Sequence, residues 1–81
     1  RVDTIQLRDA ERRMAGRLRV IRGMEPERVL LEGETVRLVY RVGGLPVLLE
    51  QYLVADSVVV TLLPPTGMPT QVVESLRARI H

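Results

Sequence analysis

The sequence predicts an α+β domain with a short N-terminal helix, an antiparallel β-meander of about four to five strands, and a C-terminal helix packed on the sheet. Three observations predict it. Apolar residues recur at helical spacing near both ends of the 81-residue chain, turns containing glycine separate apolar runs in the middle, and the last run is rich in β-branched residues. We expect residues 1–81 to form a single small domain.

The N-terminal helix is predicted from apolar residues three and four positions apart, namely Leu7, Ala10, Met14 and Leu18. Asp3 or Thr4 is expected to cap its start, and Gly16 to end it. In residues 18–22, Leu18, Val20 and Arg22 alternate with Arg19 and Ile21, which predicts a brief strand before a loop at residues 23–27.

Two predicted two-residue turns, Gly33-Glu34 and Gly43-Gly44, divide residues 28–51 into three apolar runs. Both turns place the same set of side chains on one side of a three-stranded sheet. A slip of one residue in either pairing would move that set to the other side. The predicted core face consists of Val29, Leu31, Val36, Leu38, Tyr40, Val42, Leu45, Val47 and Leu49.

The other face of this predicted sheet carries the candidate protein-contact surface. Arg37 lies opposite Glu50, where an ion pair suits a solvated surface and helps to define the register. Val39 lies opposite Leu48 on the same face, and Tyr52 lies nearby. We expect these five residues to contact another protein chain, because apolar side chains beside a free strand edge favour association.

The rest of the chain predicts one further strand and the closing helix. Pro46 has no N–H, but position 46 does not exchange backbone hydrogen bonds with the preceding strand, so proline is compatible with this pairing. We therefore expect the N-terminal end of strand 45–53 to be unpaired on the side away from the preceding strand. Residues 58–63 are apolar on both faces, which predicts a fourth, well-buried strand. Pro69 suits the first turn of a helix, whose apolar stripe is Val72, Val73, Leu76 and Ile80.

Composition argues against most site chemistry. The chain has no cysteine, so it offers no thiolate for zinc, redox or nucleophilic chemistry. Its one histidine is His81, the last residue, and neither Ser57 nor Ser75 has a base in a recognisable pattern. With 46% hydrophobic and 27% charged residues, the chain is typical of a soluble globular domain. We therefore expect no enzymatic activity, no cofactor and no metal.

Charge is distributed unevenly along the chain. Residues 1–22 contain seven arginines and three acids, whereas residues 23–76 contain three arginines and seven acids. Arginine-rich helices bind nucleic acid in other proteins. Here acids interrupt the arginine stretch, and only Tyr40 and Tyr52 are available to stack on bases. A solvated helix face is therefore the preferred interpretation, and nucleic-acid binding the less favoured one.

A family resemblance rests on the order of the parts. A short helix runs into residues 17–21, the apolar run 36–41 includes Tyr40, the turn 43–44 follows, and residues 47–51 end in Gln51. A closing helix contains residues 73–76. This order resembles the extracytoplasmic domains of bacterial transmembrane anti-sigma factors and related small envelope domains. The resemblance implies a sensory or regulatory module outside the membrane, tethered through an upstream segment to a cytoplasmic part that binds a sigma factor.

The functional expectation is a non-enzymatic protein-interaction or regulatory domain with a protein partner, including a second copy of itself. The alternative is a homo-oligomerisation or accessory domain of unrelated role. The start at Arg1-Val2-Asp3, without a methionine, predicts a fragment of a longer protein. The resemblance implies an envelope location, and it also requires a spacer, because arginines directly outside a membrane span are unfavourable. Without the resemblance, a cytoplasmic location is expected.

Overall fold

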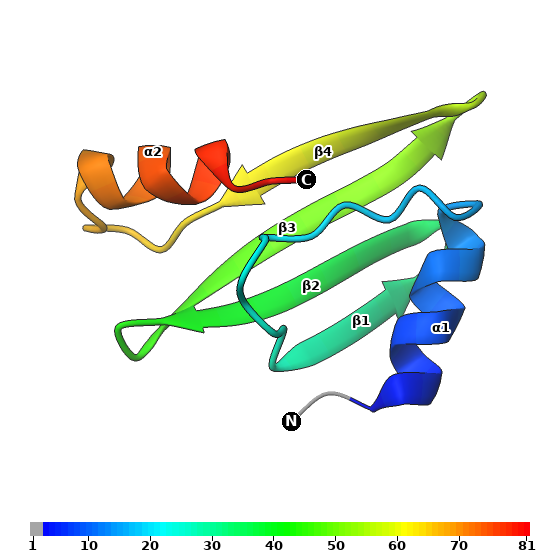
Figure 1. The fold of residues 1–81 in the computed structure, drawn as a ribbon, viewed down its shortest axis with the longest axis horizontal. Helices are drawn as coiled ribbons and strands as arrows, with labels where there is room; N and C mark the ends of the chain where they lie inside the picture. The colour runs from blue at the N-terminus through cyan, green and yellow to red at the C-terminus, as the bar shows by residue number, and fades with distance from the viewer. Residues whose placement is uncertain (1–2) are drawn as a thin grey trace.

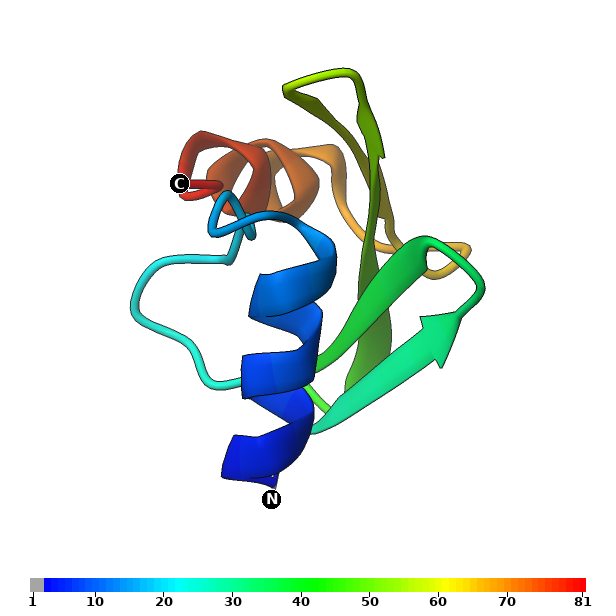
Figure 2. The same cartoon turned by 90° about the vertical axis from the view of Figure 1, so that its right-hand side faces the viewer.

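The computed structural model describes residues 3–81 and shows an α+β fold, as the sequence predicts (Figure 1). Four strands form one antiparallel sheet in the order β1-β2-β3-β4, and both helices lie on the same side of it (Figure 2). The prediction that the chain is a fragment of a longer protein rests on its start, and Arg1 and Val2 lie outside the described residues. The elements are α1 (Thr4–Arg13), β1 (Arg28–Glu32), β2 (Thr35–Val42), β3 (Leu45–Val54), β4 (Ser57–Leu63) and α2 (Thr70–Ala78).

The boundaries of α1 follow from local hydrogen bonding. The Asp3 carboxylate accepts a hydrogen bond of 2.7 Å from the Ile5 N–H, so Asp3 is the N-cap. After the helix, Ala15 and Gly16 both have positive φ, and the Gly16 N–H donates to the Glu11 carbonyl over 2.9 Å. The predicted cap and the predicted stop are therefore both confirmed.

The predicted register of the meander is also confirmed. Leu38 pairs with Val29 on β1 and with Leu49 on β3, and Tyr40 pairs with Val47. Gly43 and Gly44 have φ values of 57° and 79°, as a type I′ turn requires of its two central residues. β4 pairs with β3 only from Leu48 onward, which leaves the outer side of residues 45–47 without a strand.

The core lies between the sheet and the helices. Its fully buried side chains include Ala10 and Met14 near α1 together with Leu38, Tyr40 and Leu49 from the sheet. Leu45 was predicted to belong to the core, but its side chain is 45% exposed. It directly follows the Gly43-Gly44 turn and pairs with Val42 of β2, but β4 reaches only to Leu48, so no strand lies on the other side of Leu45.

The prediction of a well-buried fourth strand is wrong. β4 is the last strand of the sheet, and Leu62 is its only buried residue. Helices cover one face of the sheet, so Val59 and Leu63, which point to the other face, stay exposed. After β4 the chain turns at Pro64-Pro65 and continues into α2, so no fifth strand covers its outer edge.

The strand predicted at residues 18–22 is also absent from the sheet. This segment crosses over the core face, in front of β3 in Figure 1, and forms a single bridge between Ile21 and Ile80. Val20 and His81 exchange backbone hydrogen bonds of 3.3 and 2.9 Å. The alternation of side chains was correct as a pattern. The segment pairs with the C-terminal residues because it lies above the sheet rather than beside it.

Two polar side chains on the core face hold this crossing segment. Gln51 is completely buried; its Oε1 accepts from the Arg19 N–H over 2.8 Å, and its Nε2 donates to the Arg19 carbonyl over 2.9 Å. The Tyr40 hydroxyl accepts from the Ile21 N–H over 3.0 Å. No buried side-chain nitrogen or oxygen in residues 3–81 lacks a partner. The polar side chains inside the core therefore form hydrogen bonds with the backbone of the segment that crosses it.

Removing the Gln51 amide should destabilise the fold. Gln51→Leu keeps the size of the side chain but leaves the Arg19 N–H and carbonyl without their partners. We expect the free energy of unfolding to fall by about 1–3 kcal/mol, measured by urea denaturation. The matched control is Gln71→Leu in α2, where the side chain is exposed, with an expected change below about 0.5 kcal/mol. Equal stability of the two variants would contradict a stabilising role of the hydrogen bonds between the Gln51 amide and the Arg19 backbone.

The two faces of β2 should respond differently to truncation. Leu38 is completely buried, so Leu38→Ala is expected to cost about 2–5 kcal/mol of unfolding free energy. Arg37 lies next to it on the opposite face, and Arg37→Ala is expected to cost clearly less, because the side chain is partly solvated. Denaturation of both variants measures the difference. A larger loss for Arg37→Ala would show that the open side of the sheet is covered in solution.

Alkaline pH should destabilise the protein through Tyr40. Burial raises the pKa of the Tyr40 phenol above its ordinary value of 10.0, although the hydrogen bond from the Ile21 N–H opposes this shift. The unfolded chain therefore ionises first, and the free energy of unfolding should fall as pH rises above 10. Tyr40→Phe should flatten this fall, whereas Tyr52→Phe, at an exposed position, should keep it. Denaturation between neutral and alkaline pH measures the slope.

Candidate protein-interaction surface

The side of the sheet opposite both helices, hereafter the open face, carries every residue of the predicted contact surface. Side chains alternate along each strand, so the residues next to core positions point away from the helices (Figure 2). Arg37, Val39, Leu48, Glu50 and Tyr52 all lie on this face, and the register brings them together on β2 and β3, although Val39 is buried, with only 8% of its surface exposed. Other open-face residues are Leu30, Glu32, Thr35, Val54, Val59, Thr61 and Leu63.

Apolar side chains on the open face form rows across the strands. Val39 pairs with Leu48, and Leu48 pairs with Leu63, so three strands contribute to one row. Tyr52 pairs with Val59 in a second row. Tyr52, Val54, Val59 and Leu63 have exposed fractions of 40, 54, 37 and 40%. Most of the strongly exposed large apolar residues in the described chain are therefore on this face.

Sequence reasoning missed the contribution of β4 to this surface. Val59 and Leu63 were assigned to a strand buried on both sides, and Val54 was not considered. The sequence predicts a tight turn at Ala55-Asp56-Ser57, but Ser57 already belongs to β4. The two-residue turn at Ala55-Asp56 sets Val54 opposite Ser57, and the same alternation then places Val59 and Leu63 on the open face.

An ion-pair network crosses the middle of the open face. Arg37 Nε lies 2.6 Å from Glu50 Oε2, and Arg37 Nη1 lies 2.6 Å from Glu32 Oε1. The hydrogen bond from Arg37 lowers the pKa of the Glu32 carboxyl. Arg37 and Glu50 are each 28% exposed, which makes this the more enclosed of the two contacts. Each charged group at the centre of the face therefore already has a partner within the chain, and the three groups together carry one net negative charge.

A second ion pair lies at the border of the same sheet. Arg41 Nε and Nη2 donate to the two carboxylate oxygens of Glu27 over 2.8 and 3.1 Å, and Arg41 Nη1 donates to the Gly44 carbonyl. These hydrogen bonds lower the pKa of Glu27. Arg41 therefore also has its partners inside the chain.

Several arginines of the N-terminal region are engaged within the chain as well. Arg12 forms an ion pair with Asp9. Arg13 donates to the carbonyl of Gly33 at the end of β1, and Arg17 donates to the carbonyl of Ala15 over 3.2 Å. These contacts favour the interpretation of α1 as a solvated face over that of a phosphate-binding helix.

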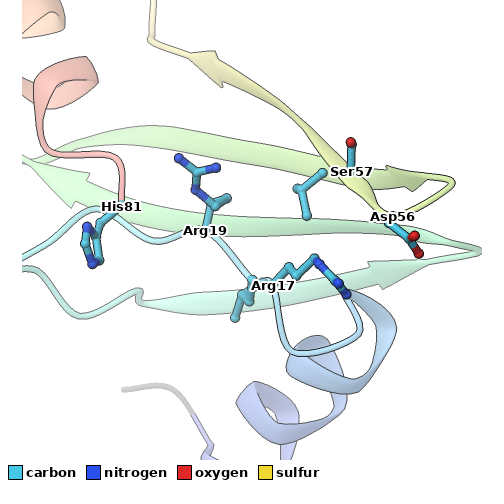
Figure 3. A pocket seen from close by; sticks show the side chains of 7 residues that line it. Arg17, Arg19, Asp56, Ser57 and His81 are labelled. Atoms are coloured by element: carbon cyan, nitrogen blue, oxygen red, sulfur yellow. The ribbon is translucent and has the colours of Figure 1, made fainter.

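A hollow of about 500 Å³ lies on the other side of the molecule, between residues 17–19, residues 56–58 and His81 (Figure 3). In Figure 3 the Arg19 guanidinium and the His81 imidazole point to opposite sides, and the Ser57 hydroxyl lies well apart from both. The hollow is open and its polar groups do not converge. Residues 3–81 contain no group of three His, Cys, Asp or Glu side chains placed to hold a metal ion.

The comparisons give no relative for this chain. No protein-family model matches it, and no curated protein and no solved structure matches it. Within residues 3–81, neither helix has the length and apolar content needed to cross a membrane. Functional inference therefore rests on the geometry of the open face.

Proposed function

We propose that this chain is a non-enzymatic protein-interaction domain that binds another protein through the open face. The observation that carries the proposal is the exposure of Tyr52, Val54, Val59 and Leu63 on a sheet face that the chain's own helices leave uncovered. An apolar surface of this kind on a small domain is typical of a protein contact. The domain contributes binding rather than chemistry.

The electrostatics of the face define the partner. Arg37 is paired with Glu32 and Glu50, and Arg41 is paired with Glu27, so each of these charged groups already has a partner, although Arg37 and its two carboxylates together keep one net negative charge. An acidic partner group placed there would lose its hydration and meet this negative charge, and a basic one would compete with Arg37 for the two carboxylates. The partner that fits is a protein surface with an apolar, uncharged centre, such as a second sheet face or the apolar stripe of a helix.

A narrower form of the proposal assigns the binding to regulation outside the membrane. The order of helix, meander and helix, which resembles anti-sigma-factor extracytoplasmic domains, is what supports it. In that case the open face would receive a sensory or regulatory protein. The test of binding is the same in either setting.

The experiment places a photo-crosslinking residue at position 48 and identifies the crosslinked protein from host cells by mass spectrometry. That protein is then purified and titrated against wild type, Leu48→Glu and Leu45→Glu. We expect Leu48→Glu to weaken binding by about ten-fold or more, because it puts a charge in the apolar row. Leu45→Glu is the matched control, since Leu45 is exposed at the hairpin end outside the open face.

Two outcomes would contradict the proposal. One is the absence of any specific crosslink from position 48. The other is a partner that binds both glutamate variants as tightly as wild type. Circular dichroism of each variant checks that the fold is retained, so that a loss of binding reports the surface.

A further inference from the structure

We propose that two copies of the chain pair through the free edge of β4, so that their two four-stranded sheets join into one antiparallel sheet. This proposal concerns the edge of the sheet rather than its open face, so it does not depend on the proposed function. It rests on the backbone groups of β4, on the composition of the strand, and on the symmetry of the pairing.

The backbone of β4 offers three residues for pairing. Val54 and Ser57 flank the two-residue turn, so they form a hydrogen-bonded pair, and such pairs recur at every second residue. Ser57, Val59, Thr61 and Leu63 therefore bond to β3. The N–H and C=O groups of Val58, Val60 and Leu62 point outward. In the described chain, none of these groups makes a hydrogen bond elsewhere, and no segment runs along the outer side of β4 (Figure 1).

The two edges of the sheet differ in their protection. β1 has five residues, begins with Arg28 and ends with Glu32, and Arg13 covers the carbonyl of Gly33 at its end. β4 has seven residues, Ser57 to Leu63, and contains no charge, no proline and no glycine. Charged residues, proline and short length are the usual devices that prevent edge pairing. β1 uses two of them, and β4 uses none.

A second copy fits this edge because the pairing is symmetric about the middle of the strand. With Val60 opposite the second copy's Val60, Val58 lies opposite Leu62 and Val59 lies opposite Thr61. All three outward residues then exchange both backbone hydrogen bonds, and every facing side chain is apolar or β-branched. No charge meets a like charge. The arrangement is isologous, since each copy uses the same residues, and it therefore closes as a dimer.

The strength of the contact follows from its size. The two-fold axis runs perpendicular to the sheet, so the helices of both copies stay on one side and both open faces stay on the other. An interface formed by one strand edge buries less than the roughly 800 Å² per partner of a standard interface. We therefore expect reversible dimerisation that depends on protein concentration.

The first experiment needs no substitution. Amide hydrogen exchange is followed by NMR at low and at high protein concentration. The amides of Val59 and Thr61 should be protected at both concentrations, because they bond to β3. The amides of Val58, Val60 and Leu62 should exchange rapidly at low concentration and become protected at high concentration. Exchange of these three amides that stays fast at millimolar concentration would overturn the proposal.

The second experiment uses a matched pair of lysine variants and analytical ultracentrifugation. Thr61→Lys places two lysines diagonally across the two-fold axis, and we expect it to weaken dimerisation by about five-fold or more. Thr35→Lys makes the same change on the open face away from β4, and we expect it to leave the dimer intact. A dimer equally affected by both variants would overturn edge pairing.

Leu48→Glu separates this proposal from the proposed function. Leu48 is a β3 residue on the open face, so its substitution should leave β4 dimerisation unchanged while it weakens partner binding. A Leu48→Glu protein that no longer dimerises would place the self-contact on the open face and overturn the edge proposal. A Leu48→Glu protein that keeps both the dimer and full partner binding would contradict the proposed function alone.

Discussion

The fold depends on the double hydrogen bond between the buried Gln51 amide and the backbone of Arg19. An amide inside an apolar core is costly unless both its oxygen and its nitrogen find partners. Gln51 obtains both from one residue of a segment far away in the sequence, and Tyr40 satisfies Ile21 two residues later. This pairing fixes where residues 18–22 cross the core face of the sheet.

The crossing segment connects the two ends of the structure. It follows α1, contacts β2 and β3 through their side chains, and exchanges hydrogen bonds with the residues after α2. Both helices and this segment therefore cover the same face of the sheet, and no helix or strand of residues 3–81 covers the other face. The open face, the free β4 edge and the incomplete burial of β4 are all consequences of this one-sided arrangement.

The open face is stable in water because of its central ion pairs. Arg37, Glu32 and Glu50 put charged groups between apolar rows that would otherwise form one continuous patch. Since each charged group has an ion-pair partner inside the chain, the face can be covered by an apolar partner without leaving a charged group unpaired. The same compensation gives the face little attraction for nucleic acid, which needs uncompensated positive charge.

The sequence by itself determined the meander, because its turns and alternation are local: Gly43-Gly44 and Gly33-Glu34 define a register that Val36, Leu38 and Tyr40 must share. It thereby also placed the five candidate contact residues on one face. Only the tertiary structure decided that residues 18–22 cross the sheet and that β4 is an exposed edge. An alternating or apolar run has the same pattern in either position, and its burial depends on which distant segments pack against it.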